Sequence, residues 1–295
     1  MKLNKISLKD QGVFLKYLSL KKHDLSVYAF ENIYIWKGLF DIYWEVFDDS
    51  LCVFFKDKIG CFLYLSPLTK ELKVKVIEKA FGVMSSMNSN EQVSRIENIE
   101  EQELDDYRRF GYRITQKFCE YICSRERLAN LSGVAYKHKR ASANYFMKNY
   151  AYEYLPFSRA DAKPCLALYV LWSSQRKENY KDKIYQGMIG DSLKSLKILF
   201  ESYKKLNCIG RIVKIDNRIK GFTFGFKLNQ DTFCVLYEIT DLSVKGLAQF
   251  IFSEFSRELE RYKYINIMDD SGLDNLKKAK LSYKPVRLVS SYIVQ

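Results

Sequence analysis

The sequence predicts an α/β protein of the α+β type, built from two tandem domains that each hold a mixed, mostly antiparallel sheet flanked by helices. Short strand candidates occur in threes with tight turns between them, which is typical of an antiparallel meander. Each meander is followed by a helix, a strand, a helix and a strand, which indicates a β-α-β crossover. This order occurs twice in 295 residues, a length that fits two domains of about 150 residues. We therefore expect one domain at 1–125 and a second at 126–295.

The first half supports this assignment element by element. Asp48-Asp49-Ser50 is a hairpin turn between two apolar runs. Leu72, Val76 and Ala80 recur at helical spacing. The expected helices are 7–22, 27–39, 70–84 and 100–110, and the expected strands are 42–47, 51–55, 61–65, 93–96 and 112–123.

The second half repeats the pattern. Asp161 is expected to N-cap a helix that tolerates Pro164 in its first turn. Asp216-Asn217-Arg218 separates the first two strands of the second meander. The expected helices are 128–150, 161–175, 189–206, 244–262 and 272–281, and the expected strands are 152–157, 210–215, 221–227, 233–239, 264–267 and 286–294.

The composition narrows the class of protein. The formal net charge is +13, which favours polyanionic partners such as nucleic acid or anionic lipid, or else reflects a solvated lysine surface. The seven cysteines are scattered and only two histidines exist, so we expect reduced core thiols, no metal site and no serine-protease-like triad. No apolar run is long enough to span a bilayer. A cytoplasmic protein is expected, either free or peripheral at the membrane.

Four stretches in chain order resemble the soluble branch of the phosphatidylglycerol lysyltransferase C-terminal family. They begin with Phe30-Glu31-Asn32-Ile33-Tyr34-Ile35-Trp36 and continue with Leu131-Ser132-Gly133-Val134-Ala135-Tyr136-Lys137-His138-Lys139-Arg140, Gly221-Phe222-Thr223-Phe224-Gly225 and the segment from Gly272 to Pro285. The resemblance implies tandem GNAT (acyl-CoA N-acyltransferase) folds related to Fem-type aminoacyl transferases. It further implies aminoacyl-tRNA or acyl-CoA as donor co-substrate, with an anionic lipid or a small molecule as acceptor, and it names no resident cofactor.

Two residues are the expected catalytic pair. Glu238 follows five apolar strand residues, and partial desolvation raises the pKa of a carboxyl toward that of a general base; a structural hydrogen-bond anchor is the alternative. The resemblance also places a Glu at this strand end. Lys280 lies where the related lysyltransferases carry a Lys at the substrate tunnel, with Tyr283 beside it, and its charge would stabilise an oxyanion. Complementing the dipole at a helix C-terminus is its alternative role.

The helix expected at 128–150 carries a cationic cluster. Lys137, Lys139 and Arg140, with Asn144 one turn on, are expected to hold phosphate groups or orient a ligand. A solvated helix face is the alternative.

Two further turns are candidates for ligand binding. Gly246 and Ala248 match the GNAT coenzyme A loop, but Ser243 stands where that loop has Gln or Arg, and close helix packing is the alternative role of Gly246. The segment at 266–270 usually reads Asn-Arg-Glu-x-Asp in the family.

Within that segment, the family's substrate residues are matched at Asn266 and Asp270, next to Asp269, whereas Ile267 and Met268 replace Arg and Glu. Both aspartates could instead cap the helix expected at 272–281. Isoleucine cannot hold an anion as arginine does, so the substrate differs or the family's chemistry is lost.

The leading hypothesis is therefore acyl or aminoacyl transfer from an activated donor to an amine or hydroxyl, in a cleft of the second domain. The first alternative is a catalytically inactive GNAT-fold protein that binds RNA or an anionic membrane surface. The second is a small-molecule N-acetyltransferase. The sequence does not indicate the oligomeric state.

Overall fold

The structure is a computed structural model that describes residues 3–179 and 182–295. It divides into two compact units, one ending at Glu120 and including Val289–Gln295, and the other comprising Tyr121–Leu288. The strands β6 (Ile114–Ser124) and β12 (Arg287–Val294) each contribute residues to both units. The end of the chain belongs to the first unit because β12 pairs there with β5, as at Ser291 opposite Glu100. The sequence had assigned all of 126–295 to one domain.

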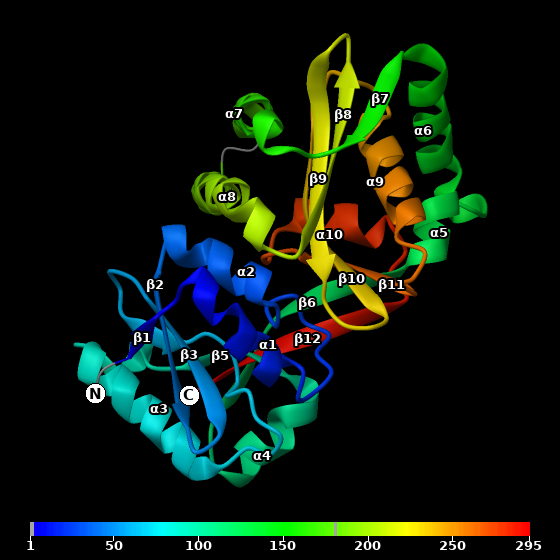
Figure 1. Cartoon of the computed structure of the whole chain (residues 1–295). Coiled ribbons are helices and arrows are strands. Elements are labelled where there is room, and N and C mark those ends of the chain that lie inside the picture. The colour runs from blue at the N-terminus through cyan, green and yellow to red at the C-terminus, as the bar shows by residue number, and fades with distance from the viewer. Residues whose placement is uncertain (1–2, 180–181) are drawn as a thin grey trace. The chain divides into compact units, whose positions relative to one another are not determined.

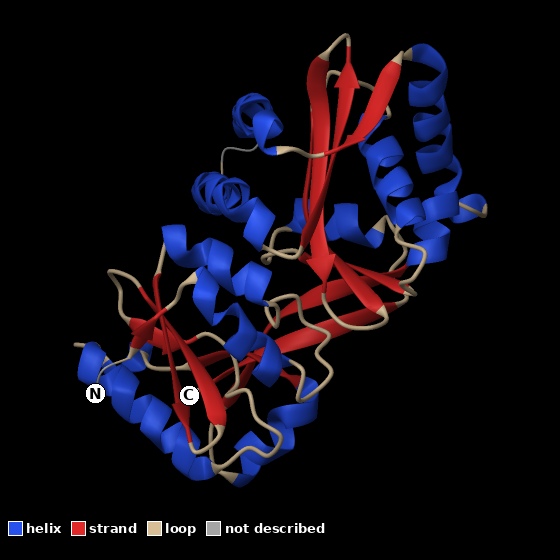
Figure 2. Ribbon diagram, viewed as in Figure 1, coloured by secondary structure: helices blue, strands red, loops and turns tan. Residues whose placement is uncertain are grey.

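The first unit contains one sheet with helices packed around it (Figures 1 and 2). Its strand order is β1-β2-β3-β4-β5-β12-β6. Asp48 and Asp49 both adopt left-handed backbone conformations, as a two-residue hairpin turn requires. The remaining elements are β1 (Asn4–Lys5), α1 (Gln11–Leu18), α2 (Phe30–Ile35), β2 (Asp41–Phe47), β3 (Ser50–Lys56), β4 (Cys61–Leu63), α3 (Val74–Met87), β5 (Ile96–Glu100) and α4 (Leu104–Arg109).

The second unit is a sheet in the order β6-β11-β10-β9-β8-β7 with helices on both faces. In Figure 1, α7 and α8 lie on one side of β8 and β9, and α6 and α9 lie on the other. The elements are α5 (Arg125–Asn130), α6 (Lys137–Asn149), β7 (Tyr152–Pro156), α7 (Ala162–Asn179), α8 (Lys183–Ser202), β8 (Cys208–Ile215), β9 (Arg218–Lys227), β10 (Thr232–Thr240), α9 (Leu247–Glu258), β11 (Tyr264–Asp269) and α10 (Asp274–Leu281).

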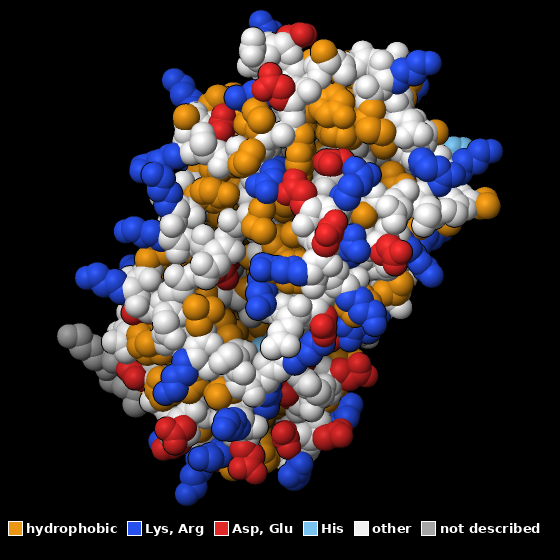
Figure 3. All heavy atoms as spheres, turned by 45° about the vertical axis from the view of Figure 1, so that its right-hand side comes forward, with side chains coloured by type: hydrophobic (Ala, Val, Ile, Leu, Met, Phe, Trp, Pro, Cys, Tyr) orange, Lys and Arg blue, Asp and Glu red, His pale blue; other side chains and the backbone are white. Residues whose placement is uncertain are grey.

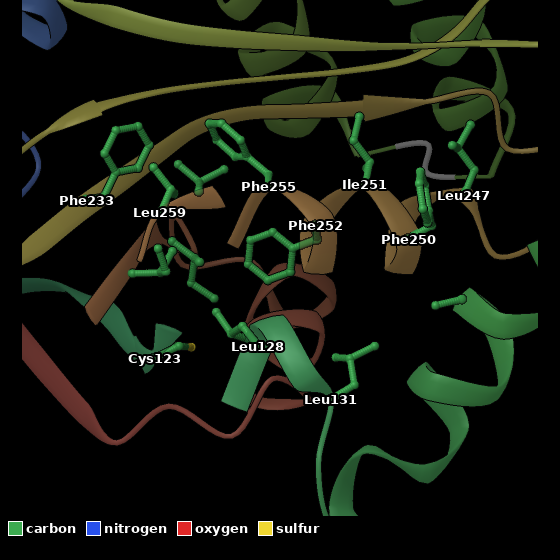
Figure 4. Close-up of a cluster of buried hydrophobic side chains, with 14 of the residues drawn as sticks. Cys123, Leu128, Leu131, Phe233, Leu247, Phe250, Ile251, Phe252, Phe255 and Leu259 are labelled. Carbon is green, nitrogen blue, oxygen red and sulfur yellow. The ribbon is translucent and has the colours of Figure 1, made fainter. Parts of the chain in front are cut away.

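The helix α9 is the centre of the core on its face of the sheet. Leu247, Ile251 and Phe255 are fully buried and recur at helical spacing, and Figure 4 shows them directed toward the strands. Phe252 is directed instead toward Leu128 of α5. Because α9 is buried on two sides, it fixes α5 and α6 relative to the sheet.

Three local predictions need correction. The helix expected at 128–150 is broken, because Leu131 and Gly133 have left-handed φ angles of 47° and 86° and separate α5 from α6. The strand expected at 93–96 begins only at Ile96. Asp161 is not the N-cap before α7: its carboxylate accepts hydrogen bonds from the N–H and hydroxyl of Ser158, so Ser158 is the first residue of a capping box.

Charged side chains of both signs lie on the surface of the protein. Among the residues with described structure, no helix combines the length and apolarity needed to cross a bilayer. On the face shown in Figure 3, Lys and Arg side chains are spread widely with Asp and Glu among them. The positive net charge is therefore not gathered into a single cationic patch on that face.

Candidate functional site

A β-bulge in β10 sets the direction of Glu238. Val235 pairs with Gly225 and Tyr237 pairs with Phe224, so Leu236 is an extra residue in the strand. Val235 packs with the α9 cluster, whereas the Tyr237 hydroxyl contacts Ser195 of α8, 2.6 Å away, on the opposite face. Glu238 therefore returns to the α9 face, because successive strand residues alternate. Without the bulge it would face α8.

Glu238 is a carboxylate without a close partner. In the part of the chain that the structure describes, no hydrogen bond or ion pair involves its side chain. The residue is partly accessible to solvent, yet burial of the carboxyl raises its pKa to about 8, opposed by the charges of Lys139 and Lys280. An unpaired carboxyl with a raised pKa is typical of general acid–base groups.

Lys139 comes to this site from α6. Its ammonium group donates to the Ser282 hydroxyl over 2.8 Å and lies 3.9 Å from the centre of the Tyr283 ring. Burial lowers the pKa of Lys139, and the nearby Glu238 opposes that shift. The hydroxyl and the ring hold the amine in one place.

Lys280 comes to the site from α10. Its ammonium group donates to the carbonyl of Ile267 at the end of β11. The Tyr283 carbonyl accepts a hydrogen bond from the Tyr136 hydroxyl, 2.8 Å away. Burial, and secondarily the charge of Glu238, holds the pKa of Tyr283 well above its usual range. Four side chains (Glu238, Lys139, Lys280 and Tyr283) therefore interact electrostatically within one unit, and we call them the Glu238 cluster.

The two central strands part beside this cluster. The parallel pairing of β10 with β11 runs from Thr232 opposite Tyr264 to Cys234 opposite Asn266. β10 continues for six more residues, to Thr240. Glu238 lies in this last segment, beyond the part of β10 that pairs with β11, where a ligand could approach the strand.

The side chains of the cationic cluster predicted on α6 have different surroundings in the structure. Lys139 joins the Glu238 cluster, but Lys137 and Asn144 are exposed to solvent. The Arg140 guanidinium donates to the carbonyls of Leu131 and Gly133, with the second contact at 3.2 Å. Arg140 therefore stabilises the break between α5 and α6, and the three side chains do not converge on one ligand position.

The segment at 266–270 is organised by its own side chains. Asn266 is fully buried and its side-chain oxygen accepts the N–H of Met268. Asp269 accepts the N–H of Ser271, and Asp270 accepts the N–H of Gly272. Neither aspartate caps α10, which begins at Asp274.

Asp270 has a second partner, because its other oxygen accepts the hydroxyl of buried Tyr121. The structure also shows where Ile267 and Met268, the two residues that differ from the family motif, lie. Ile267 packs in the apolar cluster with α9, and Met268 has a left-handed φ of 62°. Neither side chain supplies charge to the site.

The glycine of the predicted coenzyme A loop is tightly packed. Gly246 has a φ of 83°, and a Cβ atom there would lie 2.0 Å from the carbonyl oxygen of Ser142 in α6. Only glycine permits this approach of the two helices. Ala248 is half-buried in the first turn of α9, and Ser243 hydrogen-bonds to Asp241. These contacts give Gly246 a packing role.

Three contributors were missed from the sequence. Ser282 and Tyr136 lie inside stretches that carry the family resemblance, so their proximity to Lys280 and Lys139 was an available signal. No sequence signal pointed to Tyr121, because its partner Asp270 is 149 residues away along the chain.

Among residues 3–179 and 182–295, no group of three or more His, Cys, Asp or Glu side chains is placed to hold a metal ion.

Comparison with solved structures identifies the fold. A conserved protein of unknown function from Bacteroides thetaiotaomicron is 25% identical, with a TM-score of 0.87 over 100% of this chain and 99% of its own. L-PGS from Bacillus licheniformis is 16% identical, with a TM-score of 0.68 over 100% and 93%. A tandem GNAT protein from the clavulanic acid biosynthesis pathway is 7% identical, with a TM-score of 0.52 over 99% and 97%.

These similarities confirm the predicted α/β fold with a mostly antiparallel sheet, helices on its faces and GNAT-like relatives. No curated protein sequence matches the chain. The model of the family described as "Phosphatidylglycerol lysyltransferase, C-terminal" matches residues 19–295. The chain therefore belongs to the phosphatidylglycerol lysyltransferase C-terminal family.

Proposed function

We propose that this protein is a transferase that moves an activated acyl or aminoacyl group to an amine or hydroxyl acceptor at the Glu238 cluster. The single observation that carries the proposal is Glu238 itself, a desolvated carboxyl with a pKa of about 8 and no partner within ion-pair distance among the described residues. A structural carboxylate at that depth would be paired or hydrogen-bonded. Family membership supports the same class of reaction.

The proposed reaction assigns one role to each group. Ionised Glu238 accepts the proton of the acceptor N–H or O–H as that atom attacks the donor carbonyl carbon. The ester or thioester bond then breaks, and the departing oxygen or sulfur takes up the proton that Glu238 holds. Lys280 and Lys139 stabilise the negative charge on the carbonyl oxygen in between. Positioning contributes much of the rate, because the donor is already activated.

For the donor, we propose aminoacyl-tRNA ahead of acyl-CoA. The family relationship favours an aminoacyl group. The α9 N-terminus is a poor coenzyme A loop, since Gly246 packs on Ser142 and Ser243 replaces the basic or amide residue of that loop. An anionic lipid or a small amine is the proposed acceptor, and the cytoplasm, or its membrane face, is the proposed location.

A transfer assay tests the proposal. The protein is incubated with mixed charged tRNA or with acetyl-CoA, plus phosphatidylglycerol vesicles or a set of small amines, and product is detected by mass spectrometry. Glu238→Gln should abolish most of the turnover, and Glu126→Gln, at an exposed position of α5, serves as the matched control. Equal turnover in both variants would remove Glu238 from the mechanism.

A second candidate is a binding protein without catalysis, which the apolar Ile267 and Met268 favour. Binding of tRNA that weakens steeply with salt, with no transfer from any charged tRNA, would support it. A third candidate, small-molecule acetylation, predicts a thermal shift with acetyl-CoA, because a ligand at one hundred times its Kd stabilises by about 2.7 kcal/mol.

A further inference from the structure

We propose that the outer face of α6 docks on the surface of an anionic lipid bilayer. The proposal rests on the proposed function only in giving that surface a purpose, since a lipid acceptor would reach the protein there, and the binding itself is tested without transfer. Cationic and apolar side chains from α6, from the turn before it and from the turn before α9 make up the α6 docking surface. They are Val134, Lys137, Tyr145, Met147, Lys148 and Lys245, all of them exposed.

One face of α6 is directed to solvent. Four exposed residues at spacings of four, three and four share this face: Lys137, Ala141, Asn144 and Lys148. The opposite face carries Ala143 and Phe146, which are buried in the cluster around α9. Figure 1 shows α6 at the right-hand margin of the second unit, next to α9. The helix is therefore held by its apolar side and presents its polar side outward.

The α6 docking surface is cationic and lacks acidic neighbours in the sequence. No Asp or Glu occurs between Glu126 and Glu153, although the chain contains 35 such residues. Within the described part of the chain, the three lysines of this surface form no ion pair. Exposed Lys79, by contrast, lies 2.7 Å from Asp48. Unpaired ammonium groups keep their full attraction for the phosphates of anionic lipid headgroups.

Lys245 joins this surface through an aromatic contact. Its ammonium group lies 4.5 Å from the centre of the Tyr145 ring, so the turn before α9 and the middle of α6 contribute to one patch. Tyrosine is enriched at membrane–water interfaces because its ring is apolar and its hydroxyl is polar. Lysine has the same division between a hydrocarbon stem and a charged end. Both side chains suit the headgroup region of a bilayer.

Exposed apolar side chains favour a bilayer over RNA as the partner. Val134 lies in the turn between α5 and α6 and is 89% exposed, and 44% of Met147 is exposed. A bilayer interface adds the burial of such groups to its electrostatic attraction for lysine. RNA is contacted through phosphates, 2′-hydroxyls and bases that stack on aromatic rings, and none of these takes up an aliphatic side chain. Because α6 is already folded, docking does not have to order it.

Vesicle flotation of the full chain tests the cationic part of this surface. The protein should bind phosphatidylcholine vesicles that contain phosphatidylserine or phosphatidylglycerol equally well, bind pure phosphatidylcholine about ten-fold more weakly or less, and lose binding as salt is raised. The double variant Lys137→Gln/Lys148→Gln should bind the anionic vesicles at least about ten-fold more weakly, since each lysine contributes about five-fold. Lys197→Gln/Lys204→Gln, at exposed positions without ion pairs among the described residues, is the matched control and should be unchanged.

A second pair of variants tests the apolar part. Val134→Ser should weaken binding to anionic vesicles about three-fold or more, because the interface loses a buried aliphatic group. Ile59→Ser, at a position in the first unit that is 79% exposed, should leave binding unchanged. Thermal midpoints should stay constant in both variants, since neither side chain is part of the core.

Four outcomes would overturn the proposal. They are absent binding to anionic vesicles, equal binding to neutral ones, unchanged binding by Val134→Ser, and equal losses in the two lysine double variants. Binding of tRNA that is tighter than binding of vesicles, and that the Lys137→Gln/Lys148→Gln variant loses but Val134→Ser keeps, would make this an RNA surface and overturn it as well. Transfer to a small amine without vesicles should not respond to Val134→Ser, so failure of docking and failure of transfer are told apart.

Discussion

Glutamates in the two units differ in how their carboxylates are satisfied: those of the first unit are buried and hydrogen-bonded, whereas Glu238 of the second unit is half-buried and has no close partner among the described residues. In the first unit, Glu100 accepts hydrogen bonds from the N–H groups of Asp24 and Leu25 and lies 2.7 Å from His23. Glu120 accepts the N–H and the hydroxyl of Ser26. In the second unit, Glu238 has no such partner among the residues described. Satisfied carboxylates fix a loop, whereas an unsatisfied one is poised to exchange a proton with a ligand.

The largest predicted effect is on turnover. Glu238→Gln should lower the rate of acyl transfer by about 100-fold or more, the usual contribution of a general base. Its folding midpoint at pH 4 should hardly change, because the neutral amide resembles the protonated acid, and at that pH the Glu238 carboxyl is largely protonated in the unfolded chain as well. Transfer rates and thermal melts on one preparation measure both.

The matched change in the first unit should have the opposite profile. Glu100→Gln places an amide NH₂ group where the carboxylate now accepts from Asp24 and Leu25, or from Gln102 and His23. We expect a loss of about 3 kcal/mol in the free energy of unfolding, measured by urea denaturation. A loss below about 0.5 kcal/mol would show that these carboxylate contacts do not hold the loop.

Only some features of the Glu238 cluster could be predicted from the sequence. Glu238 was found because it ends an apolar run, and the hairpin turns were found because their residues are adjacent. The bulge at Leu236 depends on the pairing of β10 with β9, so no local sequence pattern predicts it. The sequence predicted that Lys139 and Arg140 hold phosphate groups together. In the structure the Arg140 guanidinium donates instead to the carbonyls of Leu131 and Gly133, at the break between α5 and α6.

The pH dependence of stability sharpens the same contrast. The folded-state pKa of Glu238, about 8, lies above its ordinary value of 4.5. The protonated form is therefore favoured by folding, and this residue destabilises the protein increasingly as pH rises from 4.5 to 8. Glu238→Gln should be more stable than the unmodified protein at pH 9 and equal to it at pH 4, with each pKa unit worth about 1.4 kcal/mol. Denaturant melts at the two pH values measure the difference, and an equal difference at both would place the pKa near 4.5.

The smallest predicted effect concerns Ser282, which anchors Lys139. Ser282→Ala removes the 2.8 Å hydrogen bond that the hydroxyl accepts from the Lys139 ammonium group and the one that it donates to the Ala279 carbonyl, but leaves the contact of Lys139 with the Tyr283 ring. The free energy of unfolding should fall by about 1 to 2 kcal/mol, the usual range for two hydrogen bonds at a partly exposed site. Because Lys139 also acts on Glu238, a less fixed ammonium should shift the pH–rate profile upward by a fraction of a unit. Ser271→Ala, which removes a hydroxyl hydrogen bond to Asp269, is the control. A profile that moves equally in both variants would mean that Ser282 acts on the stability of the turn and not on the charge beside Glu238.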